Sequence, residues 1–248
     1  MAEDGKSTVR AVERALDILL CFTAKKEWAM TEIADNVGLH KSTVHRMLST
    51  LEERGFVVRD PASERYRLGL RIWELSANMS GADDPAVIGL PEMERLRDTL
   101  GETISLYLRD GNERIRIQAV QSVQAIRRVA PIGVRLPLYV GASSKVLIAF
   151  EEPTKREELL QDPSWPSNFD RQLYREQLED WRALGYATSV EEREQGAAAV
   201  AAPVFSRTGK LVAALSVSGP ANRFTLEIMR SQAPAVMEAA RRLGVMLK

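Results

Sequence analysis

The 248-residue sequence contains one cysteine and only two histidines. The single cysteine, Cys21, cannot form an internal disulfide, which is typical of proteins of the reducing cytosol. Both histidines, His40 and His45, lie in one short segment. The rest of the chain therefore lacks the imidazole that a Ser-His-Asp triad, a Cys-His pair or a His-based zinc site requires. We expect no catalytic residue, no metal and no cofactor, although catalysis by carboxylates or lysine stays open.

Long apolar runs and a net charge are also missing. No run reaches the ~18 residues that a membrane span needs, and the first residues contain no apolar signal-peptide segment. We therefore expect a cytoplasmic protein with no membrane partner. Lys plus Arg and Asp plus Glu number 34 each, so any signal for nucleic acid must come from how the charges are distributed. The length is comfortable for two domains.

The N-terminal part predicts three helices followed by a hairpin. The first helix is expected at residues 7–22, with Val12, Ala15, Leu16, Leu19 and Leu20 on its buried face. The second is expected to end at Gly38 and the third at Gly55. Two strand-like runs, 56–59 and 65–68, flank a loop rich in turn formers. Together they predict a winged helix-turn-helix domain over residues 1–68.

The third of these helices has a polar face without any acidic residue. Val44, Met47, Leu48 and Leu51 form its apolar face, and no Asp or Glu occurs between Asp35 and Glu52. Hydroxyls, cations and the helix N-terminus suit phosphates and base edges of DNA. The hairpin arginines would act as a wing. The predicted DNA-binding residues are Thr31, His40, Lys41, Ser42, Thr43, His45, Arg46, Ser49, Arg59, Arg65 and Arg67.

Residues 69–84 predict a linker helix that ends in a cluster of breakers, and residues 85–248 predict a second domain of mixed α and β structure. Alternating strands are expected at 104–108 and 115–119, with a third run at 125–129. Further strands are expected at 197–205 and 211–218. The predicted helices of this domain cover residues 143–150, 154–160, 170–184 and 225–246.

A small-molecule cavity is predicted beside the last two strands. Ser216 and Ser218 project to one face of a strand that follows an alanine-rich one, which leaves room and supplies hydrogen bonds. The Ser143-Ser144 pair precedes a helix, where free amides favour a carboxylate. An arginine from 127, 128 or 135 could complete the contact. The prediction is a small acid; solvent-facing serines and a Ser143 that only caps its helix stay open as alternatives.

The chain resembles the IclR family of bacterial regulators over nearly its whole length. The resemblance rests on residues 12–19 and 41–48, on Tyr66-Arg67-Leu68-Gly69, and on residues 133–138, 143–145, 201–205 and 215–220. It implies an α+β protein, in which the winged helix-turn-helix is joined to a GAF-like α/β effector-binding domain at residues 85–248. It also implies a homodimer through the N-terminal half, often assembled further into a dimer of dimers.

The matching motifs imply which residues line the effector pocket. Tyr139 belongs to the same loop, although the family commonly has histidine there, and Ser144 and Val146 also depart from the usual pattern. These departures leave the identity of the ligand open. The implied effector-binding residues are Arg128, Leu136, Tyr139, Ala142, Ser143, Ala197, Ala199, Ser216 and Ser218.

The sequence thus predicts a regulator that binds an inverted-repeat operator in double-stranded DNA. We expect it to repress a catabolic operon under the control of a small organic or aromatic acid. Two alternatives remain: an enzyme with an appended DNA-binding domain, and a constitutive DNA-binding protein whose second domain only oligomerises. The absence of Gly-rich phosphate loops and of Cys/His metal spacing disfavours the enzyme.

Overall fold

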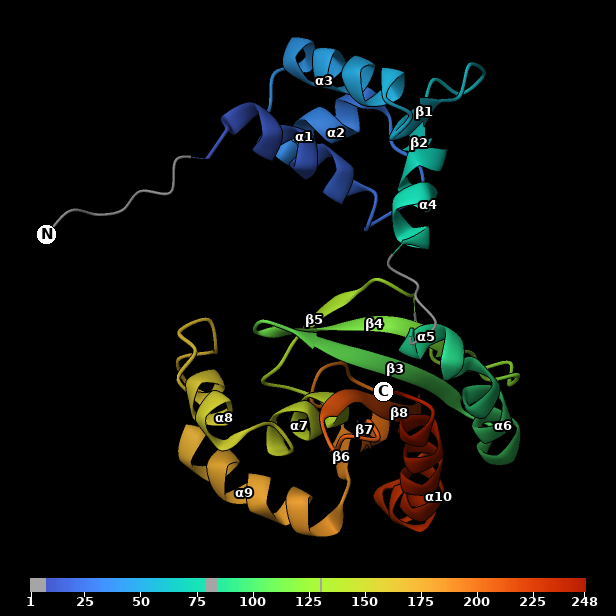
Figure 1. The fold of residues 1–248 in the computed structure, drawn as a ribbon, viewed down its shortest axis with the longest axis vertical. Coiled ribbons are helices and arrows are strands. Elements are labelled where there is room, and N and C mark those ends of the chain that lie inside the picture. The colour runs from blue at the N-terminus through green and yellow to red at the C-terminus, as the bar shows by residue number, and fades with distance from the viewer. Residues whose placement is uncertain (1–7, 79–83, 130) are drawn as a thin grey trace, which may run out of the picture. The chain divides into compact units, whose positions relative to one another are not determined.

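The computed structural model describes residues 8–78, 84–129 and 131–248 (Figure 1). The chain forms two compact units, Met1–Ala82 and Asp83–Lys248. The unit boundary falls within the linker that we expected at residues 69–84. Of that linker, residues 70–77 form a helix, whereas residues 79–83 lie outside the described part of the chain.

The first unit is built as the sequence predicts. Gly38, with φ of 63°, ends the second helix in the left-handed conformation that favours glycine. The two strands pair antiparallel with Val58 opposite Arg67, and Tyr66 forms an additional bridge with Trp28. The elements are α1 (Arg10–Cys21), α2 (Met30–Val37), α3 (Lys41–Glu53), β1 (Val57–Arg59), β2 (Tyr66–Leu68) and α4 (Leu70–Ala77).

The buried face of α1 differs from the prediction. Ile18 and Cys21 are buried, together with Phe22 just beyond the helix, whereas Leu16 is 53% and Leu20 61% exposed. The expected positions Ala15 and Leu19 are only half-buried, and Val12 is exposed. The helix carries apolar residues on more than one face, so periodicity alone could not select the face that packs on α2 and α3.

The second unit contains a six-stranded antiparallel sheet in the order β5-β4-β3-β8-β7-β6. Its strands are β3 (Thr103–Asp110), β4 (Glu113–Val120), β5 (Arg135–Pro137), β6 (Ala187–Val190), β7 (Ala197–Phe205) and β8 (Leu211–Pro220). Its helices are α5 (Pro85–Ile88), α6 (Leu90–Leu100), α7 (Ala142–Ala149), α8 (Pro153–Leu160), α9 (Arg171–Leu184) and α10 (Leu226–Val245).

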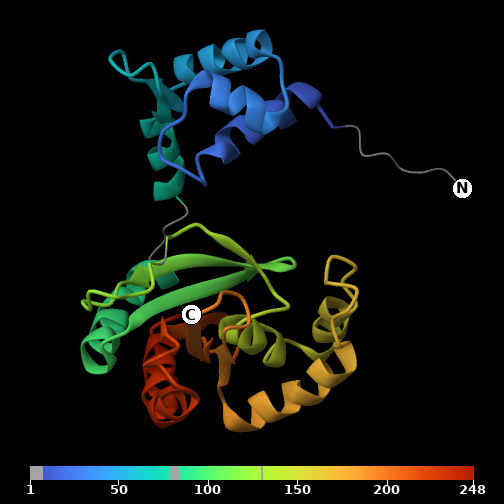
Figure 2. The same cartoon turned by 180° about the vertical axis from the view of Figure 1, so that it is seen from behind.

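Helices cover both faces of this sheet (Figures 1 and 2). On one face α6 and α10 pack against the strands, and Met93, Val200 and Leu243 belong to the core between them. On the other face lies α7, with α9 outside it; Val146, Ala214 and Leu178 belong to this second core. The three layers confirm the α+β fold with a C-terminal α/β domain.

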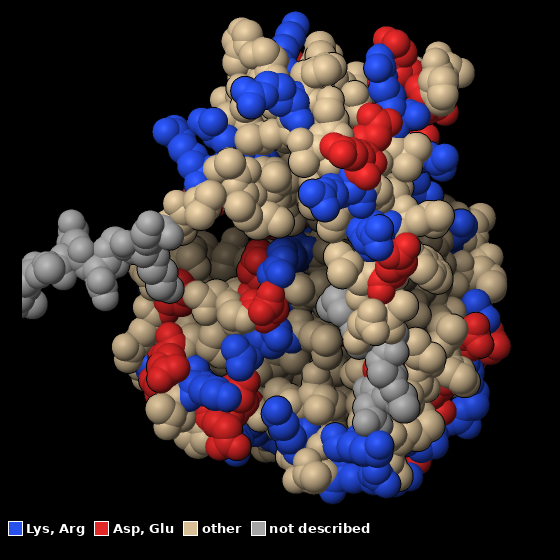
Figure 3. Space-filling model, turned by 45° about the horizontal axis from the view of Figure 1, so that its top comes forward, with Lys and Arg blue, Asp and Glu red and all other residues tan. Residues whose placement is uncertain are grey.

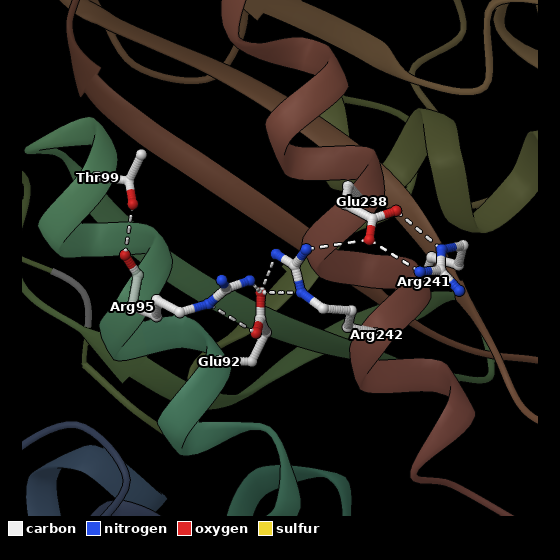
Figure 4. A network of polar contacts seen from close by, with 6 residues as sticks. All are labelled: Glu92, Arg95, Thr99, Glu238, Arg241 and Arg242. Carbon is white, nitrogen blue, oxygen red and sulfur yellow. Dashed lines mark hydrogen bonds and ion pairs between the residues drawn. The ribbon is translucent and has the colours of Figure 1, made fainter.

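An ion-pair network joins the two helices of the first layer (Figure 4). The Glu92 carboxylate on α6 accepts hydrogen bonds from Arg95 and, across the helix interface, from Arg242 on α10. Arg242 also donates to Glu238, which Arg241 contacts as well. The Glu92 side chain is only 10% exposed, so its pairing satisfies a charge that would be costly to bury alone.

Several parts of this unit depart from the sequence predictions. Helices α5 and α6 and strands β5 and β6 were not predicted, and the strand expected at residues 125–129 is wrong. The pairing at that edge is instead made by β5. In the segment from 121 to 129, backbone carbonyls are occupied by side chains: Arg223 donates to the Ile126 oxygen and Thr103 to the Arg128 oxygen. A sheet ladder does not form there.

Candidate DNA-binding surface and effector cavity

Helix α3 divides into a buried and an exposed face. Val44 and Leu48 are fully buried, and Leu51 is nearly so. On the opposite side His45, Arg46 and Ser49 are exposed. Thr31, His40, Lys41 and Ser42 are exposed as well, and Thr43 is half-buried. The fold therefore leaves the predicted DNA-reading residues of α2 and α3 on the surface, apart from Thr43.

Local hydrogen bonds fix several of these side chains. The His40 imidazole caps α3, because its Nδ1 accepts from the Ser42 amide at 3.4 Å and lies 2.8 Å from the Ser42 hydroxyl. The Ser49 hydroxyl donates to the His45 carbonyl one turn earlier. Arg46 makes no side-chain hydrogen bond or ion pair within the described residues. Arg46 is thus available to guanine or phosphate, and so is Lys41 at the start of the same helix, whose side chain also has no partner among the described residues.

The three wing arginines have different environments. Arg59 forms an ion pair with Glu64 at 2.7 Å, and Arg65 pairs with Glu32 at 3.1 Å. A hydrogen bond from Lys25, together with the Ala29 amide and the charge of Arg65, holds the pKa of Glu32 at about 2. Arg67 is exposed and has no ion-pair partner in the described part of the chain. Only Arg67 would therefore contact DNA without first leaving a carboxylate.

Charges of both signs are mixed over the surface (Figure 3). Lys and Arg as well as Asp and Glu occur on the face in view, and the whole chain has 34 basic and 34 acidic residues. Within this surface of mixed charge, the acid-free face of α3 is a local feature.

A cavity of about 50 Å³ lies within the second unit. Strands β3, β4, β7 and β8 form one side, and the beginning of α7 forms the other. Seven of the nine predicted effector residues line it: Arg128, Ala142, Ser143, Ala197, Ala199, Ser216 and Ser218. The lining also includes Tyr107, Arg114, Arg116, Gly141, Ser189, Arg193, Glu194 and Ala198.

Two arginines of β4 are buried at this cavity. Arg114 is 2% and Arg116 5% exposed. Arg114 donates to the Ser144 hydroxyl and the Pro137 carbonyl, and its Nε has no partner. Burial lowers the pKa of Arg114 to about 10; Tyr107 opposes this shift, and the charges of Arg193 and Arg116 add to it. Arg116 donates from Nε to the Tyr107 hydroxyl at 3.0 Å.

The rim of the cavity is closed by charged side chains. Arg128, whose side chain is 17% exposed, pairs with Glu194 at 2.8 Å, and Arg193 contacts the same carboxylate at 3.4 Å. At the opposite end α7 begins after Gly141, whose φ is 98°. Ser144 and Lys145 donate their amides to the Gly141 carbonyl, so the amides of Ala142 and Ser143 are the ones that the first turn leaves without a helical partner.

Leu136 and Tyr139 lie outside the cavity lining. Leu136 is buried among the residues that pack on α7, and Tyr139 belongs to an aromatic cluster with Trp165 and Phe169, both at 6.2 Å between ring centres. Arg135 is exposed and pairs with Asp110 and Glu113. Ser143 does not cap α7, because the helix already begins at Ala142.

Sequence reasoning missed Arg114 and Arg116 as cavity residues. The two arginines stand two residues apart in β4, so both side chains project from the same face of the strand. Arg116 lies opposite Tyr107 of the neighbouring strand, so the arginines share the face that carries Tyr107. An arginine in a strand usually faces solvent. The sequence alone therefore does not reveal that α7 covers this face of the sheet.

No group of three His, Cys, Asp or Glu side chains among the described residues could hold a metal ion. Within the same residues, no helix combines the length and the apolar character needed to cross a membrane. The two candidate sites are the exposed surface of α3 and the arginine-lined cavity of the second unit.

Models of known families match both units. Residues 11–61 match the IclR helix-turn-helix domain, and residues 86–245 match the model described as bacterial transcriptional regulator IclR C-terminal. Together the two matches cover most of the chain and coincide with the two compact units.

Individual proteins are similar over nearly their full length. The HTH-type transcriptional regulator KipR of Bacillus subtilis is 32% identical, covering 93% of this chain and 94% of its own. The HTH-type transcriptional repressor AllR of Klebsiella pneumoniae is 32% identical, covering 96% and 90%. The structure of an IclR homolog from Microbacterium hydrocarbonoxydans complexed with 4-hydroxybenzoate superposes with a TM-score of 0.82 at 27% identity, covering 96% and 98%. The chain therefore belongs to the IclR family of DNA-binding transcriptional regulators.

Proposed function

We propose that this regulator is a homodimeric repressor that releases an inverted-repeat operator when a small acid occupies the cavity in its second domain. The observation that carries the proposal is the cavity itself. Two buried guanidiniums and the first amides of α7 face a space with too little negative charge to balance them. Such an arrangement favours an anionic ligand.

The relatives support both halves of this proposal. AllR is named a repressor, and the Microbacterium protein was solved with 4-hydroxybenzoate, a small acid. By analogy we assign repression and acid sensing to this chain, with a catabolic operon as the target. Because the target is DNA, the site of action is the cytoplasm. The lining offers no nucleophile-base pair with a histidine, so we assign binding without turnover.

Exposed apolar residues on α1 and α4 support the homodimer. On α1, Val12, Leu16 and Leu20 fall on one helix face and are each more than half exposed. On α4, Leu70 is 80% and Trp73 75% exposed. Apolar surface of this kind marks an interface in a soluble protein. A two-fold partner docked there would present two copies of α3, which matches an inverted-repeat operator.

The test is recovery of fragmented genomic DNA by the purified full chain at ~0.15 M salt, where non-specific phosphate attraction is reduced. We expect enrichment of a few fragments that share an inverted repeat, and loss of that enrichment when pooled small organic acids are added. Even recovery of all fragments with and without acids would overturn the proposal. A turnover assay on ester and acyl substrates should show no product.

A further inference from the structure

The buried arginines of the cavity are not balanced by carboxylates. Four arginines line it, namely Arg114, Arg116, Arg128 and Arg193, against the single carboxylate of Glu194, so the formal charge of the lining is 4 − 1 = +3. The Glu194 carboxylate forms ion pairs with Arg128 and Arg193. Arg114 and Arg116 have no ion-pair partner among the described residues.

Neutral neighbours only partly satisfy these two groups. Tyr107 lies between them, with its ring 5.6 Å from the Arg114 guanidinium carbon and 5.0 Å from that of Arg116. Its ring and hydroxyl stabilise cations but carry no net charge. The Arg114 Nε is buried without any hydrogen-bond partner, and so is the hydroxyl of Ser105, which lies opposite Ser216 in the sheet. A buried charge left unpaired is costly, so the site is electrostatically incomplete without a ligand.

The size of the cavity restricts the ligand. A cavity of about 150 Å³ in another protein accommodates benzene, whereas this one measures about 50 Å³. Its walls are small residues, including Ala197, Ala199 and Ser216, and its single aromatic lining residue, Tyr107, is held by Arg116. A four-carbon diacid has more heavy atoms than benzene, so either ligand requires the walls to move apart. An aliphatic chain is narrower than a ring and requires the smaller movement.

We propose that the effector is a short aliphatic dicarboxylate, with one carboxylate at Arg114 and the beginning of α7 and the other at Arg116. This inference rests on the proposed function, since it identifies the acid that the cavity senses. Two negative charges match the two unpaired guanidiniums. The amides of Ala142 and Ser143 and the Ser143 hydroxyl add donors at the first end, and Ser216 and Ser218 add hydroxyls on the strand side.

The test compares acids of equal chain length by isothermal titration calorimetry on the full-length protein. Malonate is paired with propionate and succinate with butyrate, at matched ionic strength because dianions screen more strongly; 4-hydroxybenzoate is the aromatic probe. We expect at least one dicarboxylate to bind at least about tenfold more tightly than its monocarboxylate pair, as a second charge-assisted contact should give. We expect 4-hydroxybenzoate to bind more weakly than either member of that pair.

Variants separate this cavity from adventitious charge attraction. Arg114→Gln should reduce the preference for the dicarboxylate to less than about threefold, since only one unpaired guanidinium then remains. Arg135→Gln is the matched control: it removes an arginine of the adjacent strand that lies outside the cavity, and should keep the full preference. The circular dichroism spectrum and the melting temperature of both variants show whether they are folded.

The possible results are distinguishable. Equal affinity within both the malonate/propionate and the succinate/butyrate pair, tighter binding of 4-hydroxybenzoate, or an unchanged preference in Arg114→Gln would overturn the dicarboxylate assignment. The proposed function would survive those results, because an acid still binds. If neither the aliphatic acids nor 4-hydroxybenzoate binds at about 10 mM, and none raises the melting temperature, the dicarboxylate assignment and the proposed acid sensing are both wrong.

Discussion

At the scale of single residues, we expect DNA recognition to depend most on Arg46. It is exposed on the acid-free face of α3 and has no competing ion pair among the described residues. Of the wing arginines, Arg59 and Arg65 are held by Glu64 and Glu32, and only Arg67 has no ion-pair partner among the described residues. We therefore assign base or phosphate contact to Arg46 first and to the wing second.

Replacing Arg46 by alanine should weaken operator binding by about tenfold to a hundredfold, because a bidentate contact to guanine contributes roughly 1–3 kcal/mol. Fluorescence anisotropy with the enriched operator measures the change. Arg54→Ala is the control, since Arg54 is an exposed arginine that follows the last turn of the same helix. Equal losses in the two variants would show that only general charge matters.

Gly141 is the residue that keeps space for Arg114. A Cβ at this position would lie 3.1 Å from the Arg114 Nη2, and the φ of 98° disfavours any side chain. Gly141→Ala should therefore reduce acid binding by at least about tenfold. Gly133→Ala controls for backbone strain, because Gly133 also has a positive φ of 85° but nothing within 4 Å of a Cβ. Calorimetry should show nearly unchanged acid binding in that control.

At the scale of elements, Glu32 connects three parts of the DNA-binding domain. Its carboxylate accepts from the Ala29 amide at the start of α2, from Lys25 in the preceding turn and from Arg65 in the wing. The pKa of Glu32 is lowered to about 2 by these contacts, from an ordinary value of 4.5. Between these two values the unfolded chain binds a proton that the folded chain does not.

The contribution of Glu32 to stability is thus present above about pH 4.5 and is lost as pH falls towards about 2. Glu32→Gln should increase amide hydrogen exchange of residues 29–37 at about pH 6. It should also reduce the additional loss of protection on going to about pH 3. Glu53→Gln, at an exposed position of α3, should leave both quantities unchanged. Identical acid sensitivity in the two variants would contradict the assigned role.

At the scale of the whole molecule, the apolar face of α1 is expected to join two copies of the chain. Leu16→Lys places a charge in that face at little cost to the folded protomer, because Leu16 is already 53% exposed. Analytical ultracentrifugation should show a shift from dimer towards monomer, with operator affinity reduced by at least about tenfold. Asp17→Lys, on the same helix beside that face, should remain dimeric. A dimeric Leu16→Lys variant would place the interface elsewhere.

The sequence predicts the architecture of this protein better than its site. The first domain could be predicted from local features, namely glycines that end helices, helical periodicity and the basic face of α3. Ser216, Ser218 and Ser143 could be placed at a pocket because strand alternation and a helix start are local features. Arg114 and Arg116 could not, because only the pairing of β4 with β3 and the covering helix α7 make that strand face an interior one. The buried face of α1 was predicted wrongly for the same reason, because the elements that pack against this helix decide which face is buried.

The most direct test is to measure the affinity of the protein for its enriched operator fragment with and without a saturating acid. We expect acid to weaken operator binding by at least about tenfold in the unmodified chain and by less than about threefold in Arg114→Gln. A ligand shifts this equilibrium only through its different affinity for the two states. Operator affinity that no acid changes, or a full acid response in Arg114→Gln, would contradict control by an acid bound at Arg114.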